Sequence, residues 1–155
     1  MDIRPLAPPD RQQLAELLSR IETFTPDEVL CALELIDGAL QPNNPDYQVL
    51  VADREGRMVG YVCFGPSPMT DGTFDLYWIA SDPQVRGQGI GAALVSAMEG
   101  ELRRRKGRLI RVETSAMEAY GPTRGFYAAM QYKEESRFRD FYKAGEDLVT
   151  LAKRL

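Results

Sequence analysis

The 155-residue sequence contains no histidine and only two cysteines. Without histidine, neither Ser-His-Asp nor Cys-His nucleophilic catalysis can be assembled, and two scattered cysteines are too few ligands for a zinc site. Cys31 and Cys63 lie inside apolar segments, so we expect two buried free thiols rather than a disulfide or a nucleophile. Any acid or base must therefore be a tyrosine, a carboxylate, a lysine, a cysteine or water, and no bound metal is predicted.

Long apolar runs are also absent, as is a basic stretch leading into an apolar segment at the N-terminus, so we expect a cytoplasmic protein with no membrane partner. A net charge of −4 and a pI near 5.0 argue against nonspecific binding to nucleic acid. The one basic cluster, Arg103–Lys106, is expected to be the solvated last turn of a helix. The length and the 44% hydrophobic content predict a single domain spanning residues 1–155.

Hydrophobic periodicity and turn residues predict an alternation of strands and helices. Helices are expected after an Asp10 cap, after a Thr25 cap, from Ile90 to Leu102 and over residues 120–130. Strands are expected at residues 1–6, 47–52, 58–64, 73–81, 109–114, 132–142 and 147–153. The predicted order of elements is therefore β-α-α-β-β-β-α-β-α-β-β.

Residues 84–91, Gln-Val-Arg-Gly-Gln-Gly-Ile-Gly, form the most informative stretch of the chain. They follow a predicted strand and open an amphipathic helical pattern. Glycines at alternate positions let the backbone approach a bulky anion and direct several N–H groups at it, and the following helix adds the positive end of its dipole. The stretch therefore predicts a phosphate-binding loop; a plain glycine-rich turn between strand and helix is the alternative.

Three kinds of phosphate-bearing ligand compete for this loop. A Walker loop requires the string G-x-x-x-x-G-K-[ST], which is missing. Gly87, Gly89 and Ala92 fit the G-x-G-x-x-A variant of the dinucleotide fingerprint, with Glu113 at about the distance expected for a ribose-binding acid. That fingerprint should begin directly after its strand, whereas residues 82–86 intervene here. It should also open a set of βαβ units, whereas this stretch lies in the second half of the chain. The pyrophosphate of coenzyme A is the third ligand.

The string Arg86-x-x-Gly89-x-Gly91 resembles the [Q/R]-x-x-G-x-[G/A] signature of the GNAT acetyltransferase superfamily, and the preceding W-I-A-S-D-P-Q-V-R resembles its strand and loop. Together with the element order, the resemblance covers essentially the whole chain. It implies an α+β fold with a central mixed, twisted sheet of about six to seven strands flanked by about four helices. It also implies that the strands on either side of the glycine-loop helix splay apart.

The resemblance further implies that acetyl-CoA is the cofactor and that an acetyl group moves to a primary amine by direct attack in a ternary complex. The acceptor is expected to be a small molecule or a peptide, and homodimers are common in the superfamily. The loop is expected to hold the cofactor through Val85, Arg86, Gly87, Gln88, Gly89, Ile90 and Gly91, with Arg86 as a charge partner of phosphate. The preceding strand is expected to supply the backbone of Trp78, Ile79 and Ala80, including an N–H toward the acetyl carbonyl.

Tyr127 is the expected general acid. The segment Gly125–Tyr132 resembles the family's F-Y-x-x-x-G-F, in which the tyrosine protonates the leaving thiolate, and a phenol with a pKa near 10 is protonated at neutral pH. The alternative is a packing aromatic on a short helix. Two positions depart from the family pattern: Gln131 stands where glycine is usual, and Tyr120 stands where many members have asparagine. Either Gln131 forms a left-handed cap, at a cost of about 1 kcal/mol, or the helix ends differently.

The general base is predicted among carboxylates on the strands beside the glycine loop. Thr73, Asp75 and Tyr77 share one face of their strand by period-two alternation, and Asp75 is the first choice. Glu113 on the next strand is the second choice. Each could take a proton from an ammonium directly or through water, and each could equally be a structural or surface carboxylate.

The acceptor is expected near the segment between the first two helices, which includes Phe24, and near the final hairpin. Tyr77, Asp140 and Tyr142 complete the predicted acceptor site. Carboxylates with aromatic rings suit a cationic amine through ion pairing and cation–π contact, although a polar hairpin tip over core aromatics is the alternative. A non-catalytic acyl-CoA-binding or sensing module is the rival function, and a dinucleotide oxidoreductase is a remote third.

Overall fold

The computed structural model describes residues 1–155 and contains seven strands, four α-helices and two short 3₁₀ turns. The strands are β1 (Asp2–Pro5), β2 (Gln48–Arg54), β3 (Arg57–Pro66), β4 (Thr73–Ser81), β5 (Leu109–Ser115), β6 (Lys133–Lys143) and β7 (Glu146–Arg154). The helices are α1 (Asp10–Ser19), α2 (Pro26–Ala39), α3 (Ile90–Arg104) and α4 (Gly121–Ala129), with 3₁₀ turns η1 (Pro83–Val85) and η2 (Glu118–Tyr120). The predicted order of elements is confirmed.

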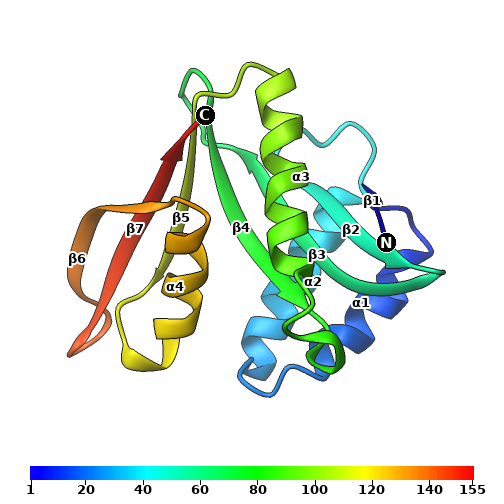
Figure 1. Ribbon diagram of the computed structural model, residues 1–155, viewed down its shortest axis with the longest axis horizontal. Coiled ribbons are helices and arrows are strands. Elements are labelled where there is room, and N and C mark those ends of the chain that lie inside the picture. The colour runs from blue at the N-terminus through cyan, green and yellow to red at the C-terminus, as the bar shows by residue number, and fades with distance from the viewer.

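All seven strands form one mixed sheet in the order β1-β2-β3-β4-β5-β7-β6. Only β4 and β5 run parallel; every other neighbouring pair is antiparallel. Helices α3 and α4 cover one face and α1 and α2 the other (Figure 1). Each face therefore has its own buried apolar cluster, one of 18 residues under α3 and α4 and one of 12 residues under α1 and α2. The α+β fold class is confirmed.

Two expectations about helix ends and side chains differ in their outcome. The Thr25 cap is confirmed as a capping box, in which the Glu28 N–H donates to Thr25 Oγ1 at 3.1 Å and Thr25 N–H donates to Glu28 Oε1 at 3.3 Å. The Asp10 cap is wrong, because Asp10 is the first residue of α1 and Pro9 occupies the N-cap position, without a side-chain cap. The Asp10 carboxylate instead accepts hydrogen bonds from Arg4 Nη1 and Nη2, at 2.8 and 2.9 Å, and so ties β1 to α1.

The two cysteines differ in burial. Cys63 is buried on β3, as expected, but Cys31 is exposed on α2. The buried positions of α2 are Ala32 and Ile36, and each helical residue is turned by about 100° from the last, so Cys31 lies off the buried stripe. The basic cluster Arg103–Lys106 is exposed at the end of α3, as predicted. None of the helices has both the length and the apolar composition required to cross a membrane.

The parallel strands β4 and β5 separate soon after they begin. Only Thr73, Phe74 and Asp75 pair with β5, opposite Leu109–Arg111. Beyond these three pairs the strands diverge, and Figure 1 shows them opening toward the glycine loop at the lower end of the view. The predicted splay is confirmed, and it leaves one backbone edge of each strand unpaired inside the molecule.

A bulge in β4 lies where the splay opens. Phe64 of β3 pairs with Leu76 and the adjacent Cys63 pairs with Trp78, so Tyr77 is the extra residue. The bulge reverses the alternation: Leu76 belongs to the cluster under α3 and α4, whereas Trp78 packs against the cluster under α1 and α2. Bulges of this kind commonly re-aim side chains next to functional sites.

Candidate active site

The glycine loop places a row of unpaired backbone N–H groups at the start of α3. Gly87 and Gly89 have φ angles of +78° and +79°, and Gly89 is the N-cap of the helix. The first backbone bond of the helix is donated by Ala93 to Gly89 O, so the N–H groups of residues 86–92 have no acceptor in the protein. A Cβ atom added at Gly87 or Gly89 would meet nothing within 4 Å. The loop is therefore an open, donor-rich pocket for an anion.

Side chains of the loop fall into two groups. Arg86, Gln88 and both loop glycines are exposed, and Arg86 forms no ion pair within the protein. Gln88 Oε1 accepts a hydrogen bond from Arg54 Nη1 at 2.7 Å. Ile90 is buried under α3, and Val85 packs against the same cluster. The Val85 N–H already donates to Asp82 O at 3.0 Å, so Ile90 can serve a ligand through its backbone N–H, and Val85 only through its carbonyl.

Asp82 holds the loop in place and was not singled out in the sequence. Its side chain is fully buried, and Oδ2 accepts from Arg20 Nη2 and Arg57 Nη2, both at 2.8 Å. Oδ1 accepts from the Gln84 N–H at 2.9 Å and caps η1. Burial alone would raise the pKa of Asp82, but the Gln84 N–H and the two guanidinium groups outweigh it and hold that pKa below its usual range. The Asp82-Pro83 pair was the local signal that could have revealed this cap.

The backbone of Trp78, Ile79 and Ala80 runs along the open side of β4. On its other side this segment pairs with Tyr61–Cys63 of β3. The edge that faces β5 has no strand partner, so its N–H and C=O groups are available to a ligand in the gap. The Trp78 ring packs edge-on against Phe24 at 5.3 Å between ring centroids. Phe24 thus lies beside the β4 edge, but it does not line the acceptor cavity described below.

Tyr127 lies on α4, on the same face of the sheet as α3. It is 2% exposed, and its ring packs edge-on against Phe126 and Tyr132 at 5.2 and 5.6 Å. Its hydroxyl makes no hydrogen bond within the protein. Burial raises the pKa of Tyr127 above its usual range, so the phenol remains a proton donor at neutral pH. Packing and proton donation are compatible roles for this side chain.

Gln131 ends α4 with a left-handed residue, φ +72°. The Gln131 N–H donates to Ala128 O at 3.0 Å, and the Tyr132 N–H donates to Tyr127 O at 2.9 Å, which is the Schellman pattern. Of the two possible helix ends, the left-handed cap is the one observed. A glutamine therefore occupies a left-handed position that glycine would occupy at a lower cost in conformational free energy. The motif also holds the backbone of Tyr127.

A cavity of about 210 Å³ lies on the opposite face of the sheet from Tyr127. Strands β4, β5 and β6 contribute its lining: Asp75, Leu76, Tyr77, Arg111, Glu113 and Tyr142. The structure therefore brings together four of the predicted catalytic and acceptor residues and adds Arg111, which sequence reasoning missed. No local motif marks Arg111, because its significance comes from pairing across the sheet.

The two predicted bases differ in what they touch. Asp75 is 9% exposed; its Oδ1 accepts from Arg111 Nε at 2.7 Å, and its Oδ2 accepts from Ser67 Oγ at 2.6 Å. Glu113 is exposed, and no side-chain hydrogen bond or ion pair engages its carboxylate. Both oxygens of Asp75 are occupied by protein donors, whereas the carboxylate of Glu113 is free, so the geometry favours Glu113 over Asp75 as a base.

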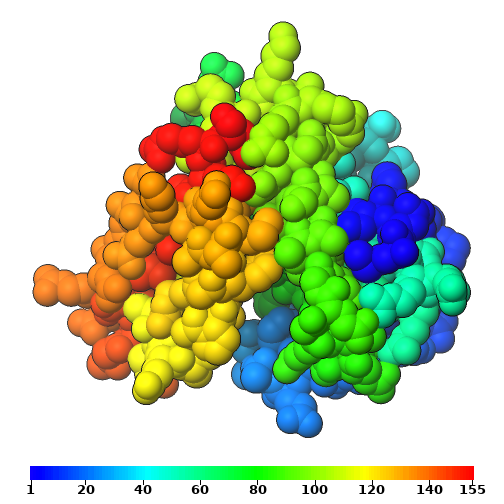
Figure 2. All heavy atoms as spheres, in the orientation of Figure 1, coloured from blue at the N-terminus to red at the C-terminus, as the bar shows by residue number.

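The aromatic rings of the cavity remain neutral. Burial, and then the charge of Asp75, raise the pKa of Tyr77; burial, and then Glu113 and Glu146, raise that of Tyr142. Tyr120, at the start of α4, has its pKa raised by burial and then by Glu28 of α2 and by Glu146. Figure 2 shows the start of α2, in blue, at the recess between α4 and the glycine loop. Carboxylates of α2, β4, β5 and β7 therefore lie close enough to these three phenols to oppose their ionisation.

Asp140 lies away from this cavity. It has a left-handed backbone, φ +56°, and its Oδ1 accepts from the Gly145 N–H at 2.8 Å. Its own N–H donates to Asp147 Oδ1 at 3.0 Å. Asp140 therefore shapes the β6–β7 turn, which corresponds to the alternative of a polar hairpin tip.

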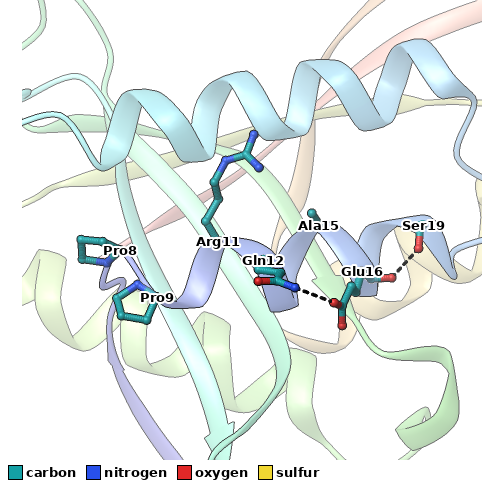
Figure 3. Close-up of a pocket in the computed structure, with 7 residues that line it drawn as sticks. All are labelled: Pro8, Pro9, Arg11, Gln12, Ala15, Glu16 and Ser19. Atoms are coloured by element: carbon teal, nitrogen blue, oxygen red, sulfur yellow. Dashed lines mark hydrogen bonds between the residues drawn. The ribbon is translucent and has the colours of Figure 1, made fainter.

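A second hollow, about 620 Å³, lies along the outer side of α1 and is lined by none of the predicted site residues (Figure 3). Its lining consists of Pro8, Pro9, Arg11, Gln12, Ala15, Glu16 and Ser19. The polar groups there are bonded to one another or to the neighbouring helix: Gln12 and Ser19 donate to Glu16, and Arg11 points to Asp37 of α2. It is an open groove of satisfied surface groups, and we do not assign it chemistry.

Comparison with known proteins identifies the family. The GNAT acetyltransferase domain matches residues 45–134. A solved structure of a protein assigned to the GNAT family, from Desulfovibrio desulfuricans, shares 35% identity and a TM-score of 0.94, covering 99% of this chain and 98% of that chain. No protein of curated function matches the sequence. The chain belongs to the GNAT acetyltransferase family, as the glycine signature predicted.

More distant solved enzymes share the fold. The ribosomal-protein-S18-alanine N-acetyltransferase of Escherichia coli is 22% identical, with a TM-score of 0.77 and coverage of 99% of this chain and 92% of that chain. An aminoglycoside 6'-N-acetyltransferase solved with coenzyme A is 19% identical, with a TM-score of 0.78 and coverage of 99% and 97%. The names of these two enzymes show that one fold serves acceptors of very different size.

Proposed function

We propose that the protein acts as a single-domain N-acetyltransferase that moves an acetyl group from acetyl-CoA to a primary amine. One observation carries the proposal: unpaired backbone donors at the start of α3 lie at the open end of the β4–β5 gap. Tyr127 lies on one face of the sheet beside that gap and Glu113 on the other. An anion site, a proton donor and a proton acceptor are therefore arranged around one opening.

The residues present fit a phosphate-bearing cofactor. The N–H groups of residues 86–92 are unpaired, and the space above Gly87 and Gly89 is open. They would hold the pyrophosphate, with Arg86 as a charge partner, and the free edge of residues 78–80 would pair with the cofactor's amide-bearing arm. Acetyl-CoA, when bound, supplies the acetyl group as an activated thioester.

The chain's own groups would then move two protons. The Glu113 carboxylate takes a proton from the acceptor's ammonium, directly or through water, and so makes the amine nucleophilic. Backbone N–H groups on the open edge of β4 orient and stabilise the carbonyl oxygen as charge develops on it. The Tyr127 hydroxyl would donate its proton to the departing sulfur, and the second proton lost by the attacking nitrogen as the amide forms would restore the phenol. No residue of the chain needs to form a covalent bond to the acetyl group, which is consistent with the absence of histidine.

Thermal unfolding with acetyl-CoA, CoA and NADH tests the first half of this proposal. A ligand at a hundred times its dissociation constant adds about 2.7 kcal/mol, which raises the midpoint of a protein of this size by about 5–10 °C. We expect a shift with both CoA compounds and none with NADH. A shift with NADH alone would show that the loop binds a dinucleotide, and would refute both the proposed cofactor and the proposed reaction. Binding of CoA without consumption of acetyl-CoA, across a broad panel of amines, would point to a sensing module instead.

Tyr127→Phe tests the second half. The ring stays in the core, and the lost hydroxyl has no protein partner, so the unfolding midpoint should remain within about 2 °C of the wild-type value. The turnover number should fall by about 10²- to 10⁴-fold, because the leaving sulfur loses its proton donor. Steady-state kinetics with any accepted amine measures this change. Unaltered turnover and an unaltered pH profile would leave Tyr127 as a packing residue, with water as the donor.

A further inference from the structure

Arg111 is held in place by a buried carboxylate that uses only part of its guanidinium. Arg111 and Asp75 are register partners on β5 and β4, and the Nε atom donates to Asp75 Oδ1 at 2.7 Å. Asp75 is in turn fixed by Ser67, whose Oγ donates to Oδ2 at 2.6 Å and which is itself buried. The Nη1 and Nη2 groups of Arg111 have no acceptor in the protein, and Arg111 lines the cavity. Arg111 therefore has two guanidinium nitrogens without a protein partner beside the cavity, while its Nε is anchored.

Glu113 supplies the complementary charge on the same strand. Residues 111 and 113 project from the same face of β5, with their Cα atoms roughly 6–7 Å apart. The charges face the same cavity, yet neither a hydrogen bond nor an ion pair joins them. Tyr77 of the bulge and Tyr142 of β6 form the walls. The cavity thus presents a guanidinium anchored at Nε and a carboxylate without a protein partner, on residues whose Cα atoms are roughly 6–7 Å apart.

We propose that the acceptor is a small amine that also carries a carboxylate, such as a free amino acid, whose carboxylate binds Arg111 and whose amino group faces Glu113. This inference rests on the proposed N-acetyltransferase function and specifies its substrate class. The cavity volume of about 210 Å³ lies below the range of roughly 300–1,000 Å³ typical for drug-sized ligands, so a compact acceptor fits better than a multi-ring one.

Charge alone would also admit a simple cationic amine, because Asp75 offsets Arg111 and leaves Glu113 unbalanced. The decisive difference is that Nη1 and Nη2 are already oriented by the Asp75–Ser67 support. A carboxylate can accept both groups as a fork without the cost of ordering the side chain, whereas a simple amine leaves them unused. An acceptor with both charges engages the whole cavity.

The test compares matched acceptors that differ only at the carboxylate. Each set contains an α-amino acid, its amide and the decarboxylated amine, and the readout is kcat/KM for CoA release by wild type, Arg111→Gln and Arg111→Lys. Wild type should prefer the amino acid in its best set by at least tenfold. Arg111→Gln should lose about 10- to 100-fold on the amino acid, mainly through KM, and change the amine by less than about threefold. Arg111→Lys should retain part of the preference, because it keeps the charge but not the fork.

Arg137→Gln is the matched control. Arg137 is 46% exposed and ion-paired to Asp147 at 2.9 Å, much as Arg111 is 44% exposed and paired to Asp75 at 2.7 Å, but Arg137 does not line the cavity. It should leave the preference intact, and thermal unfolding of all variants checks folding. Equal or better use of the amide and the amine by wild type would overturn the inference and leave the acetyltransferase proposal standing. If acetyl-CoA binds but no amine of any set is acetylated, the proposed function itself fails, and this inference with it.

Discussion

Gly89 offers a test that separates the cost of backbone strain from the loss of a binding site. Its φ of +79° lies in the left-handed region, and an added Cβ would meet nothing within 4 Å. Gly145, in the β6–β7 turn, has φ +83° and equally open surroundings. Alanine at either position therefore carries the same backbone penalty and creates no steric clash. The two glycines differ only in location, because Gly89 caps α3 beside the unpaired donors.

The expected loss of stability is the same for Gly89→Ala and Gly145→Ala. A left-handed alanine costs about 1–2 kcal/mol, and part of this is offset because alanine restricts the unfolded chain more than glycine does. We expect a net loss of about 1 kcal/mol and a drop of roughly 2–4 °C in the unfolding midpoint for each variant. Differential scanning fluorimetry measures both values without ligand.

Affinity for CoA should separate the two variants. In Gly89→Ala the new methyl group stands among the donors of residues 86–92, and loss of one charge-assisted hydrogen bond, about 1.5–3 kcal/mol, weakens binding by about 10- to 100-fold. Gly145→Ala should bind CoA like wild type. Calorimetric titration at one fixed ionic strength supplies both constants, since the interaction is screened by salt. Wild-type affinity in Gly89→Ala, or an equal loss in both variants, would refute the assignment of the loop.

Three further changes test individual groups. The folded-state pKa of Asp82 is lowered, so its contribution to stability is present above the unfolded pKa of about 3.9 and is lost as the pH falls through the folded value. Asp82→Asn should therefore lower the unfolding midpoint by roughly 4–10 °C at pH 7 and by less below about pH 4. A gap between the two unfolding curves that is constant with pH would contradict this. Gln131→Gly removes a left-handed side chain and should stabilise the protein by about 0.5–1 kcal/mol, seen as a midpoint raised by about 1–4 °C with kcat unchanged; no gain would mean that the cap is unstrained. Glu113→Gln should reduce kcat/KM by about 10²- to 10⁴-fold without altering CoA affinity, whereas Asp75→Asn should act mainly through acceptor KM; the reverse pattern would make Asp75 the base.

Local sequence signals were sufficient for the elements and the loop. The capping box at Thr25, the turn before Arg57 and the alternating glycines each act within a few residues, so their structures follow from neighbouring side chains and backbone freedom. The order of elements followed from hydrophobic periodicity and turn residues, whereas the splay came from the family resemblance. Asp10 shows the limit of spacing rules, because its carboxylate binds Arg4 of β1, six residues earlier, instead of capping α1.

Long-range pairing explains what the sequence did not reveal about the site. Arg111 and Asp75 are 36 residues apart, and Arg20 and Asp82 are 62 apart, so no spacing rule joins them. The bulge at Tyr77 likewise depends on the register between β3 and β4, whereas period-two alternation assumes an unbroken ladder. From the sequence, Asp75 is the first choice of base and Glu113 the second, and both are carboxylates on neighbouring strands. Only their partners distinguish them, and those partners are tertiary contacts.

The splay also sets how the sheet holds together as a cooperative unit. Backbone pairing between the group β1–β4 and the group β5–β7 is confined to the three pairs at one end of β4 and β5. The rest of that boundary depends on side chains packed beneath α3 and α4. A molecule bound in the gap touches both groups, so its binding energy is added at the weakest junction of the sheet rather than spread over the protein. Binding in the gap should therefore increase the cooperativity with which β1–β4 and β5–β7 unfold.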